Sequence, residues 1–384
     1  MSYPLEEVNK RRTFAIISHP DAGKTTITEK VLLYGNAIQK AGSVKGKGSA
    51  QHAKSDWMEM EKQRGISITT SVMQFPYNEC LVNLLDTPGH IDFSAEMERT
   101  LQVLDYAVLV ISGPDGVQGH TQTLWKLLEK YQIPVFIFVN KMDQPGTEKE
   151  FILGELQAKL NSSVTDFSEL QSEEFYEQVS LCEEEMLNQY LEQGEVEVSQ
   201  IAEKISERKI FPCVFGSALR MEGVKHLLEV MQTFLLEPSY DEVFGAKVFK
   251  IMRDDKGARL TYVKVTGGQL KPRMELSDKK GEWTEKINQI RVYSGSRFET
   301  VAQAVPGMIC ALTGLTKTYP GEGLGAEFDS GAPVLEPVLT YRILFPDGEE
   351  PAKMLPKLRE IEEEEPALHI VWNEELQEIH AQVM

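Results

Sequence analysis

The sequence predicts an α/β domain built on parallel strands, followed by an all-β barrel and an incomplete α+β domain. Three observations lead to this prediction. Short apolar runs in the first 240 residues alternate with helical patterns, and each run ends in a loop of Gly and polar residues. From residue 245 the apolar residues recur with a period of two, which is typical of antiparallel strands. From residue 337 the pattern becomes strand, helix and strand.

The first apolar run, at residues 14–17, leads into the loop Ser18-His-Pro-Asp-Ala-Gly-Lys-Thr-Thr26, and residues 27–33 have the pattern of an amphipathic helix. A strand, a loop ending in Gly-Lys-Thr and a helix form an arrangement that binds phosphates through backbone N–H groups. Lys24 would reach the β- and γ-phosphates, and the Thr25 hydroxyl would bind Mg²⁺. Ser18 departs from the strict pattern, which has Gly at this position.

The next segment predicts a loop that could close over a bound phosphate. Residues 35–56 are rich in Gly, Ser, Lys and Gln, as expected of a mobile loop that a nucleotide could order. In the following segment, Gln63-Arg-Gly-Ile-Ser-Ile-Thr69, the hydroxyl of Ser67 is a candidate second side-chain ligand of Mg²⁺. The alternative is an ordinary loop hydroxyl, and only the upstream phosphate loop favours the ligand.

A second strand-end loop supplies a carboxylate and a histidine. The run at residues 80–85 predicts a buried strand that ends in Asp86-Thr-Pro-Gly-His90. An acid at the C-terminal end of a strand beside a phosphate loop is placed to hold Mg²⁺ through water, so we assign this role to Asp86. Gly89 lacks a Cβ, which lets its N–H approach the γ-phosphate. His90 could orient the attacking water; the alternative is a structural histidine.

Two later strand ends predict a binding site for a guanine base. Residues 106–111 and 133–139 predict further strands, and the second ends in Asn140-Lys-Met-Asp143. The Asp143 carboxylate would accept hydrogen bonds from the N1–H and the exocyclic amine of guanine. Adenine offers no such pair, and a site whose polar groups would be left unpaired discriminates by about 10⁴–10⁵. Lys141 would lie along the base.

The fifth strand, at residues 211–215, ends in Gly216-Ser-Ala-Leu219, whose N–H groups could contact guanine O6. This short motif is informative because it is the fifth motif in the expected order and follows a strand. Residues 147–208 form an acidic segment with helical periodicity, for which we expect a solvated helical insertion; a partner-docking surface is the alternative. An amphipathic helix at residues 222–236 ends the domain.

The remaining chain predicts two smaller domains. Four alternating or apolar runs predict the strands of an antiparallel barrel, and they are residues 247–252, 260–265, 286–292 and 308–312. Residues 321–333 are rich in Gly and predict a link. A strand from residue 337, a helix at residues 352–363 and a strand at residues 367–372 predict the front half of a split βαβ sandwich. The pattern ends at Met384 inside a strand, which predicts an open sheet edge.

The composition fits a folded protein that works in water, with 41% hydrophobic and 26% charged residues. The formal net charge of −19 argues against DNA and against general nucleic-acid binding, but not against docking on RNA through local patches. The four cysteines have no metal-type spacing and fit a reducing compartment. The N-terminus is polar and no apolar run reaches membrane-spanning length, so we expect a cytoplasmic monomer without membrane contact.

The motifs together resemble those of a known family. The order Gly-Lys-Thr, Arg-Gly-Ile-Ser, Asp-Thr-Pro-Gly-His, Asn-Lys-Met-Asp and Ser-Ala-Leu resembles that of the translational GTPases, the class of elongation factors Tu and G. Residues 11–90, which include Arg64-Gly-Ile-Ser-Ile-Thr-Thr70, closely resemble bacterial peptide chain release factor 3. From Ile91 onward, Asp115-Gly-Val-Gln118 and Asn140-Lys-Met-Asp-Gln144 are similar to elongation factor G and to the ribosomal protection proteins of tetracycline resistance. The pattern is that of a mosaic or of an engineered fusion joined near His90.

The resemblance implies a P-loop GTPase domain at residues 1–240, a β-barrel at residues 241–333 and an incomplete, ferredoxin-like βαβ domain at residues 334–384. It implies GTP or GDP and Mg²⁺ as ligands, with Thr25, Ser67 and Asp86 at the metal and His90 as the catalytic residue. The residues expected to contact GTP are Ser18, His19, Pro20, Asp21, Ala22, Gly23, Lys24, Thr25, Thr26, Asp86, Thr87, Pro88, Gly89, His90, Asn140, Lys141, Met142, Asp143, Ser217, Ala218 and Leu219.

Three functional hypotheses follow. Residues 1–90 favour a ribosome-stimulated GTPase of release factor 3 type, which recycles the decoding release factors during termination. The rest of the chain favours a ribosomal protection or elongation-factor-G-like GTPase. The third hypothesis is a guanine-nucleotide-binding module with little turnover, because the family resemblance ends before the last domains of elongation factor G.

Overall fold

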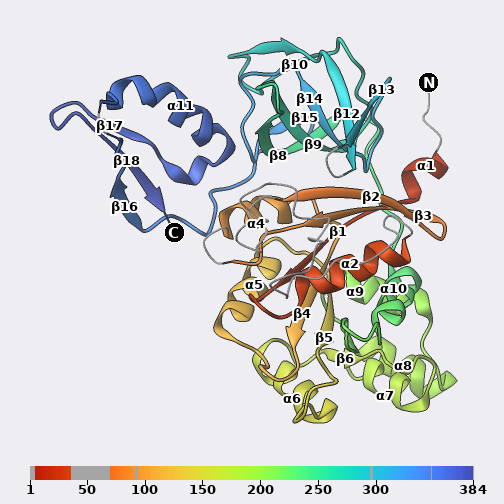
Figure 1. The fold of residues 1–384 in the computed structure, drawn as a ribbon. Helices are drawn as coiled ribbons and strands as arrows, with labels where there is room; N and C mark the ends of the chain where they lie inside the picture. The colour runs from red at the N-terminus through yellow and green to blue at the C-terminus, as the bar shows by residue number, and fades with distance from the viewer. Residues whose placement is uncertain (1–4, 36–69, 91–93, 295–296, 347, 384) are drawn as a thin grey trace. The chain divides into compact units, whose positions relative to one another are not determined.

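The computed structural model describes residues 5–35, 70–90, 94–294, 297–346 and 348–383 (Figure 1). These residues form two compact units, and each unit is built from separate stretches of the chain. Among the described residues, the first unit takes 5–35, 70–90 and 104–238, and the second takes 94–103 and those from 239 to 383. Ser67 and the predicted loop at residues 35–56, apart from Gly35, lie outside the described residues. No helix in the described ranges combines the length and apolarity needed to cross a bilayer.

The first unit is organised around a mixed sheet with the strand order β2-β3-β1-β4-β5-β7-β6. The strands are β1 (Arg11–Ser18), β2 (Ser71–Tyr77), β3 (Cys80–Asp86), β4 (Tyr106–Ser112), β5 (Val135–Asn140), β6 (Val164–Asp166) and β7 (Phe211–Phe215). All neighbouring pairs are parallel except β2 with β3. The five runs predicted as strands are the five central strands, because strands buried on both faces read as continuous apolar runs.

Helices cover both faces of this sheet (Figure 1). The helices of the first unit are α1 (Leu5–Asn9), α2 (Lys24–Tyr34), α5 (Gly119–Lys130), α6 (Lys149–Lys159), α7 (Glu173–Ser180), α8 (Glu184–Gln193), α9 (Val198–Ser206) and α10 (Val224–Phe234). Helices α2, α9 and α10 lie on one side and α5 on the other. The core between them is large and apolar, with Ile16, Leu84, Phe136 and Phe138 fully buried. The burial of four such side chains contributes about 1.5–3 kcal/mol each to folding.

Two strands of this sheet were not predicted. Strand β2 forms an antiparallel hairpin with β3 through a tight turn at Asn78, whose φ is 50°. Strand β6 lies inside the segment expected to be a helical insertion, and its three residues pair with β7. That segment also buries Phe167, Phe175 and Val179 completely or nearly so. The segment contains the helices α6 to α9 as expected, but it is not only a solvated insertion, because part of it extends the sheet and the core.

The second unit contains an antiparallel sheet with the order β13-β12-β14-β9-β8-β15, and a separate hairpin of β10 and β11. The strands are β8 (Gly245–Arg253), β9 (Arg259–Gly267), β10 (Glu275–Ser277), β11 (Thr284–Lys286), β12 (Gln289–Ser294), β13 (Arg297–Val301), β14 (Ile309–Thr313) and β15 (Gly323–Gly325). The prediction of antiparallel strands from residue 245 is confirmed. The link expected at residues 321–333 contains a strand, because β15 pairs with β8.

The last segment forms a three-stranded antiparallel sheet with the order β16-β18-β17. Its elements are β16 (Leu339–Arg342), α11 (Pro351–Glu364), the 3₁₀ helix η2 (Pro366–Leu368), β17 (Val371–Asn373) and β18 (Glu378–Val383). Helix α11 packs Leu355 and Leu358 against Ile370 and Ile379. The strand expected at residues 367–372 begins only at Val371, because Pro366 starts a 3₁₀ turn instead.

Helix α4 (Ser94–Leu101) belongs to the second unit although it lies between strands of the first in sequence. Its glutamates are buried and paired within that unit. Lys250 on β8 lies 2.9 Å from Glu96, and Arg99 binds Glu365 at 2.8 Å. Glu98, which is 1% exposed, accepts the N–H groups of residues 334 and 335 at 2.7 and 2.9 Å. Buried charges therefore fix this helix to the second unit.

The Glu98 contacts make a testable contribution to stability. Glu98→Ala removes the acceptor of two N–H groups in a buried setting, which should cost about 1–3 kcal/mol. We expect amide hydrogen exchange at residues 334 and 335 to accelerate about tenfold or more, as measured by mass spectrometry. The exposed Glu375→Ala is the control and should leave this exchange unchanged. Equal exchange in both variants would show that the Glu98 contacts do not hold this segment.

Candidate functional site

The loop between β1 and α2 has the backbone of an anion-binding turn. Asp21 and Gly23 have positive φ values of 63° and 100°, and the helix begins at Lys24, earlier than the predicted residue 27. Because α2 begins there, Lys24, Thr25 and Thr26 lie in its first turn, where N–H groups have no acceptor in the helix. These N–H groups and the helix dipole favour a negatively charged group at this point.

Ser18 is compatible with this loop although the strict motif has Gly there. Ser18 is 3% exposed, and its hydroxyl donates a hydrogen bond to the carbonyl oxygen of His19 at 2.8 Å. Its φ is not among the positive values of the non-glycine residues described. The position therefore does not need the conformational freedom of glycine.

The phosphate loop and the end of β3 meet in a buried ion pair. Lys24 Nζ contacts Asp86 Oδ1, and the two side chains are 8% and 1% exposed. Within the described residues, Asp86 Oδ2 is buried and has no hydrogen-bond partner. A Cβ placed on Gly89 would lie 3.6 Å from Cε of Lys24, so this glycine also adjoins the lysine. A buried carboxylate oxygen without a partner is costly and suits a site that a ligand completes.

Asn140 joins the phosphate loop to a third strand-end loop. Its Nδ2 donates to the carbonyl oxygen of Ala22 at 2.9 Å, and its Oδ1 accepts the N–H of Ala218 at 2.8 Å. Gly23 lies so close that a Cβ there would be 2.2 Å from Asn140 Nδ2. The Asn-Lys-Met-Asp and Ser-Ala-Leu segments are further tied by Met142 N–H, which donates to Gly216 O at 3.0 Å.

Asp143 lies partly exposed beside the Ser-Ala loop, where we expect the base. The Ser217 hydroxyl, which donates a hydrogen bond, and then the positive charge of Arg220 lower the pKa of the Asp143 carboxyl. Arg220 Nε lies 3.4 Å from its Oδ2. No motif in the sequence singles out Arg220. Leu219 differs from its neighbours Ser217 and Ala218, because its side chain is 77% exposed while theirs are buried.

Lys141 is held near this place by its own contacts. It has a positive φ of 65°, and its Nζ lies 3.9 Å from Asp115 Oδ2. The Ser112 hydroxyl donates to the same carboxylate at 2.5 Å. These contacts tie the loop that follows β5, which carries Lys141, to the turn that follows β4.

A histidine of the phosphate loop contacts a second histidine, and only the first was predicted as a site residue. The rings of His19 and His120, the second residue of α5, have centroids 5.6 Å apart with an interplanar angle of 63°. His90 is exposed at the end of its strand-end loop. No local sequence pattern singles out His120, because His19, the residue whose ring it contacts, lies far earlier in the chain.

The described residues offer few side-chain ligands for Mg²⁺, but those ligands are of the kind that Mg²⁺ binds beside a polyphosphate. They contain no group of three or more His, Cys, Asp or Glu side chains arranged to hold a metal. Mg²⁺ retains water and is bound by one or two carboxylates or hydroxyls together with substrate phosphates. The unpartnered buried oxygen of Asp86 and the hydroxyl of Thr25 in the first turn of α2 are donors of this kind.

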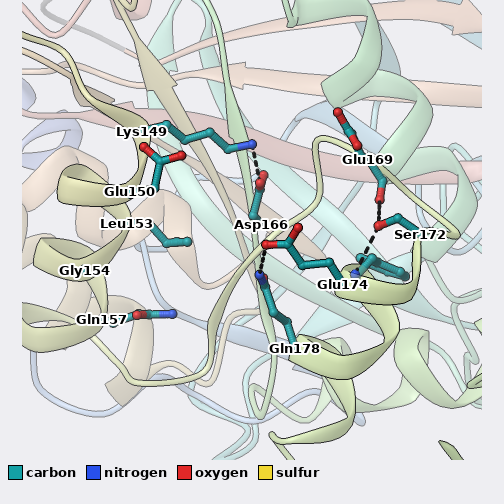
Figure 2. Close-up of a pocket in the computed structure, with 11 residues that line it drawn as sticks. Lys149, Glu150, Leu153, Gly154, Gln157, Asp166, Glu169, Ser172, Glu174 and Gln178 are labelled. Atoms are coloured by element: carbon teal, nitrogen blue, oxygen red, sulfur yellow. Dashed lines mark hydrogen bonds and ion pairs between the residues drawn. The ribbon is translucent and has the colours of Figure 1, made fainter.

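A separate pocket lies in the acidic segment at residues 147–208, between α6, β6 and α7 (Figure 2). Its volume is about 320 Å³, and an ion pair between Lys149 and Asp166 lies on its wall. Glu150, Glu169 and Glu174 also line it, so its surface is acidic. None of the residues that line it belongs to the predicted nucleotide site.

Comparison with known proteins agrees with the arrangement of these loops. Residues 9–237 match the family described as the elongation factor Tu GTP binding domain. Residues 244–324 match elongation factor G domain 2. A crystal structure of a protein from Thermus thermophilus superposes with a TM-score of 0.82 at 25% sequence identity, over 98% of this chain and 64% of that one. The present chain thus spans just under two thirds of the length of the solved protein.

The family match covers the phosphate loop, the β3 end and both base loops, which the tertiary structure brings together. The domains of this family bind GTP or GDP with Mg²⁺. The chain belongs to the translational GTPases of the elongation factor Tu GTP-binding-domain family.

Proposed function

We propose that this protein hydrolyses GTP and that the ribosome stimulates the reaction. The observation that carries this proposal is the contact between four separated strand-end loops, made by the Lys24–Asp86 pair and by the two hydrogen bonds of Asn140. Such a cluster of loops can hold a triphosphate at one end and a base at the other. Family membership supports a site in the cytoplasm on the ribosome, where translational GTPases act.

The proposed mechanism relies on positioning and on charge. The N–H groups of the first turn of α2 and Lys24 neutralise charge that develops on the phosphates. Mg²⁺, held by Thr25, by Asp86 through water and by Ser67, would neutralise further charge there. His90 orients the attacking water, and the ribosome places its ring; Asp143 selects guanine. Partner stimulation of switch GTPases reaches about 10⁵-fold, equivalent to roughly 7 kcal/mol of barrier.

For the finer role we propose release of the decoding release factors from the ribosome during termination, as in peptide chain release factor 3. The support is the resemblance of residues 11–90, which include the phosphate loop and the Asp86-Thr-Pro-Gly-His90 motif. This resemblance concerns the loops that we assign to the phosphates and Mg²⁺.

A second role is favoured by another observation. The match of residues 244–324 to elongation factor G domain 2, together with the sequence from Ile91 onward, supports an elongation-factor-G-like role. Within that branch, ribosomal protection against tetracycline is the specific candidate.

The two roles and the inactive alternative give different results in one set of assays. We expect slow GTP turnover by the free protein and faster turnover with ribosomes. Release of a decoding release factor from stalled ribosomes supports the first role, and release of tetracycline supports the second. Absence of any stimulation by ribosomes would contradict the main proposal and favour a binding module with little turnover.

Asp143→Asn tests the base site. The substitution replaces two acceptor positions by one acceptor and one donor, so GTP affinity should fall about 100-fold or more. Xanthosine triphosphate, whose base presents a carbonyl in place of the amine, should become the better ligand. Equilibrium binding of both nucleotides measures the change, and an unaltered guanine preference would place the base elsewhere.

His90→Ala tests the water-orienting role. Because His90 is exposed and lies after the strand, nucleotide affinity should stay near that of the unchanged protein. Ribosome-stimulated turnover should fall by about 10²–10⁴, the usual contribution of a positioned acid or base. Single-turnover hydrolysis and nucleotide binding are measured in parallel, and an equal loss in both would make His90 a structural residue.

A further inference from the structure

Two imidazoles from different elements face each other at the phosphate loop. His19 follows the last residue of β1, and His120 lies in the first turn of α5, which packs on β1. Their ring centroids are 5.6 Å apart and their planes meet at 63°. Within the described residues, both Nδ1 atoms are buried and have no hydrogen-bond partner. Two buried ring nitrogens without partners indicate a site whose bonding changes with a ligand or with a proton.

Burial and two neighbouring histidines disfavour the protonated form of His120. Burial lowers the pKa of His120, and electrostatic repulsion with His19 and His90 lowers it further. Charged residues on α5 itself begin at Lys126, and Asp115 in the preceding turn is bound by Ser112 and Lys141. The neutral imidazole is therefore favoured at neutral pH when only protein groups surround it.

A polyphosphate in the loop that carries His19 would reverse this balance. Its negative charges favour the protonated form of a nearby imidazole, as any opposite charge does. By linkage, a group that binds a proton more tightly in the complex makes the ligand bind more tightly as the pH falls.

We propose that His120 is a proton-binding residue of the nucleotide site, which takes up a proton when a guanine nucleotide occupies the loop beside His19. This inference rests on the proposed binding of GTP and deepens it. It assigns His120 a function distinct from the catalytic role of His90, because its charge acts on binding. Hydrolysis is not needed to observe it.

The test is calorimetric titration of GDP and of a non-hydrolysable GTP analogue near pH 6.5, the ordinary pKa of histidine, in two buffers with different ionisation enthalpies. For the unchanged protein, the difference between buffers should show net proton uptake. His120→Gln and His120→Phe each remove the titrating ring, and the second keeps an aromatic ring against His19. Both variants should take up fewer protons, by up to about half a proton per nucleotide.

The affinity gives a second readout. Between about pH 7.5 and about pH 6, GDP affinity should rise roughly threefold more in the unchanged protein than in either variant. His226→Gln is the matched control, because His226 lies in the same unit and bonds to Phe167 O at 2.7 Å. It should leave proton uptake unchanged.

Unchanged proton uptake in both His120 variants would overturn the inference. A fall in affinity by the same factor at every pH would also overturn it, since that is the result of a purely structural role. A failure of the unchanged protein to bind either nucleotide would instead contradict the proposed function, so the two failures are distinguishable.

Discussion

The candidate site depends above all on the side-chain amide of Asn140. One amide bonds a carbonyl in the phosphate loop and an N–H in the Ser-Ala loop, so three segments far apart in sequence share one buried group. An amide is suited to this because it offers a donor and an acceptor at fixed spacing. Leaving either backbone partner unpaired in a buried place costs about 1–3 kcal/mol. The close approach also explains Gly23, where any Cβ would overlap the amide.

The two ends of the site differ in charge and burial for a physical reason. At the phosphate end, Lys24 and Asp86 are almost fully buried and bind each other, so each is desolvated before any ligand arrives. Desolvated charges interact strongly with a phosphate or a metal because little water screens them. At the base end, Asp143 stays partly exposed and is kept ionised by Ser217 and Arg220. An ionised acceptor there can discriminate between bases, whereas a protonated one could not.

The segment after His90 connects this chemistry with the second unit. Only residues 91–93 separate His90 from α4, and α4 is fixed to the second unit by Lys250, Arg99 and Glu98. Buried ion pairs contribute little net stability, but they define one arrangement because a displaced partner would leave a charge unpaired.

The sequence alone determined the central strands and the loops at their ends. Buried parallel strands read as apolar runs, and Gly-Lys-Thr and Asn-Lys-Met-Asp carry their chemistry locally. The resemblance to translational GTPases, based on these motifs, is confirmed at the family level by the comparisons.

Tertiary structure decided the rest. Strands β6 and β15 have three residues each and exist because neighbouring strands supply their hydrogen bonds. The assignment of α4 to the second unit depends on buried partners far along the chain. Arg220 and His120 gain their significance only from Asp143 and His19, which no local pattern places beside them. A sequence records what each segment can form by itself, whereas contacts between distant segments are selected by the packing of the whole domain.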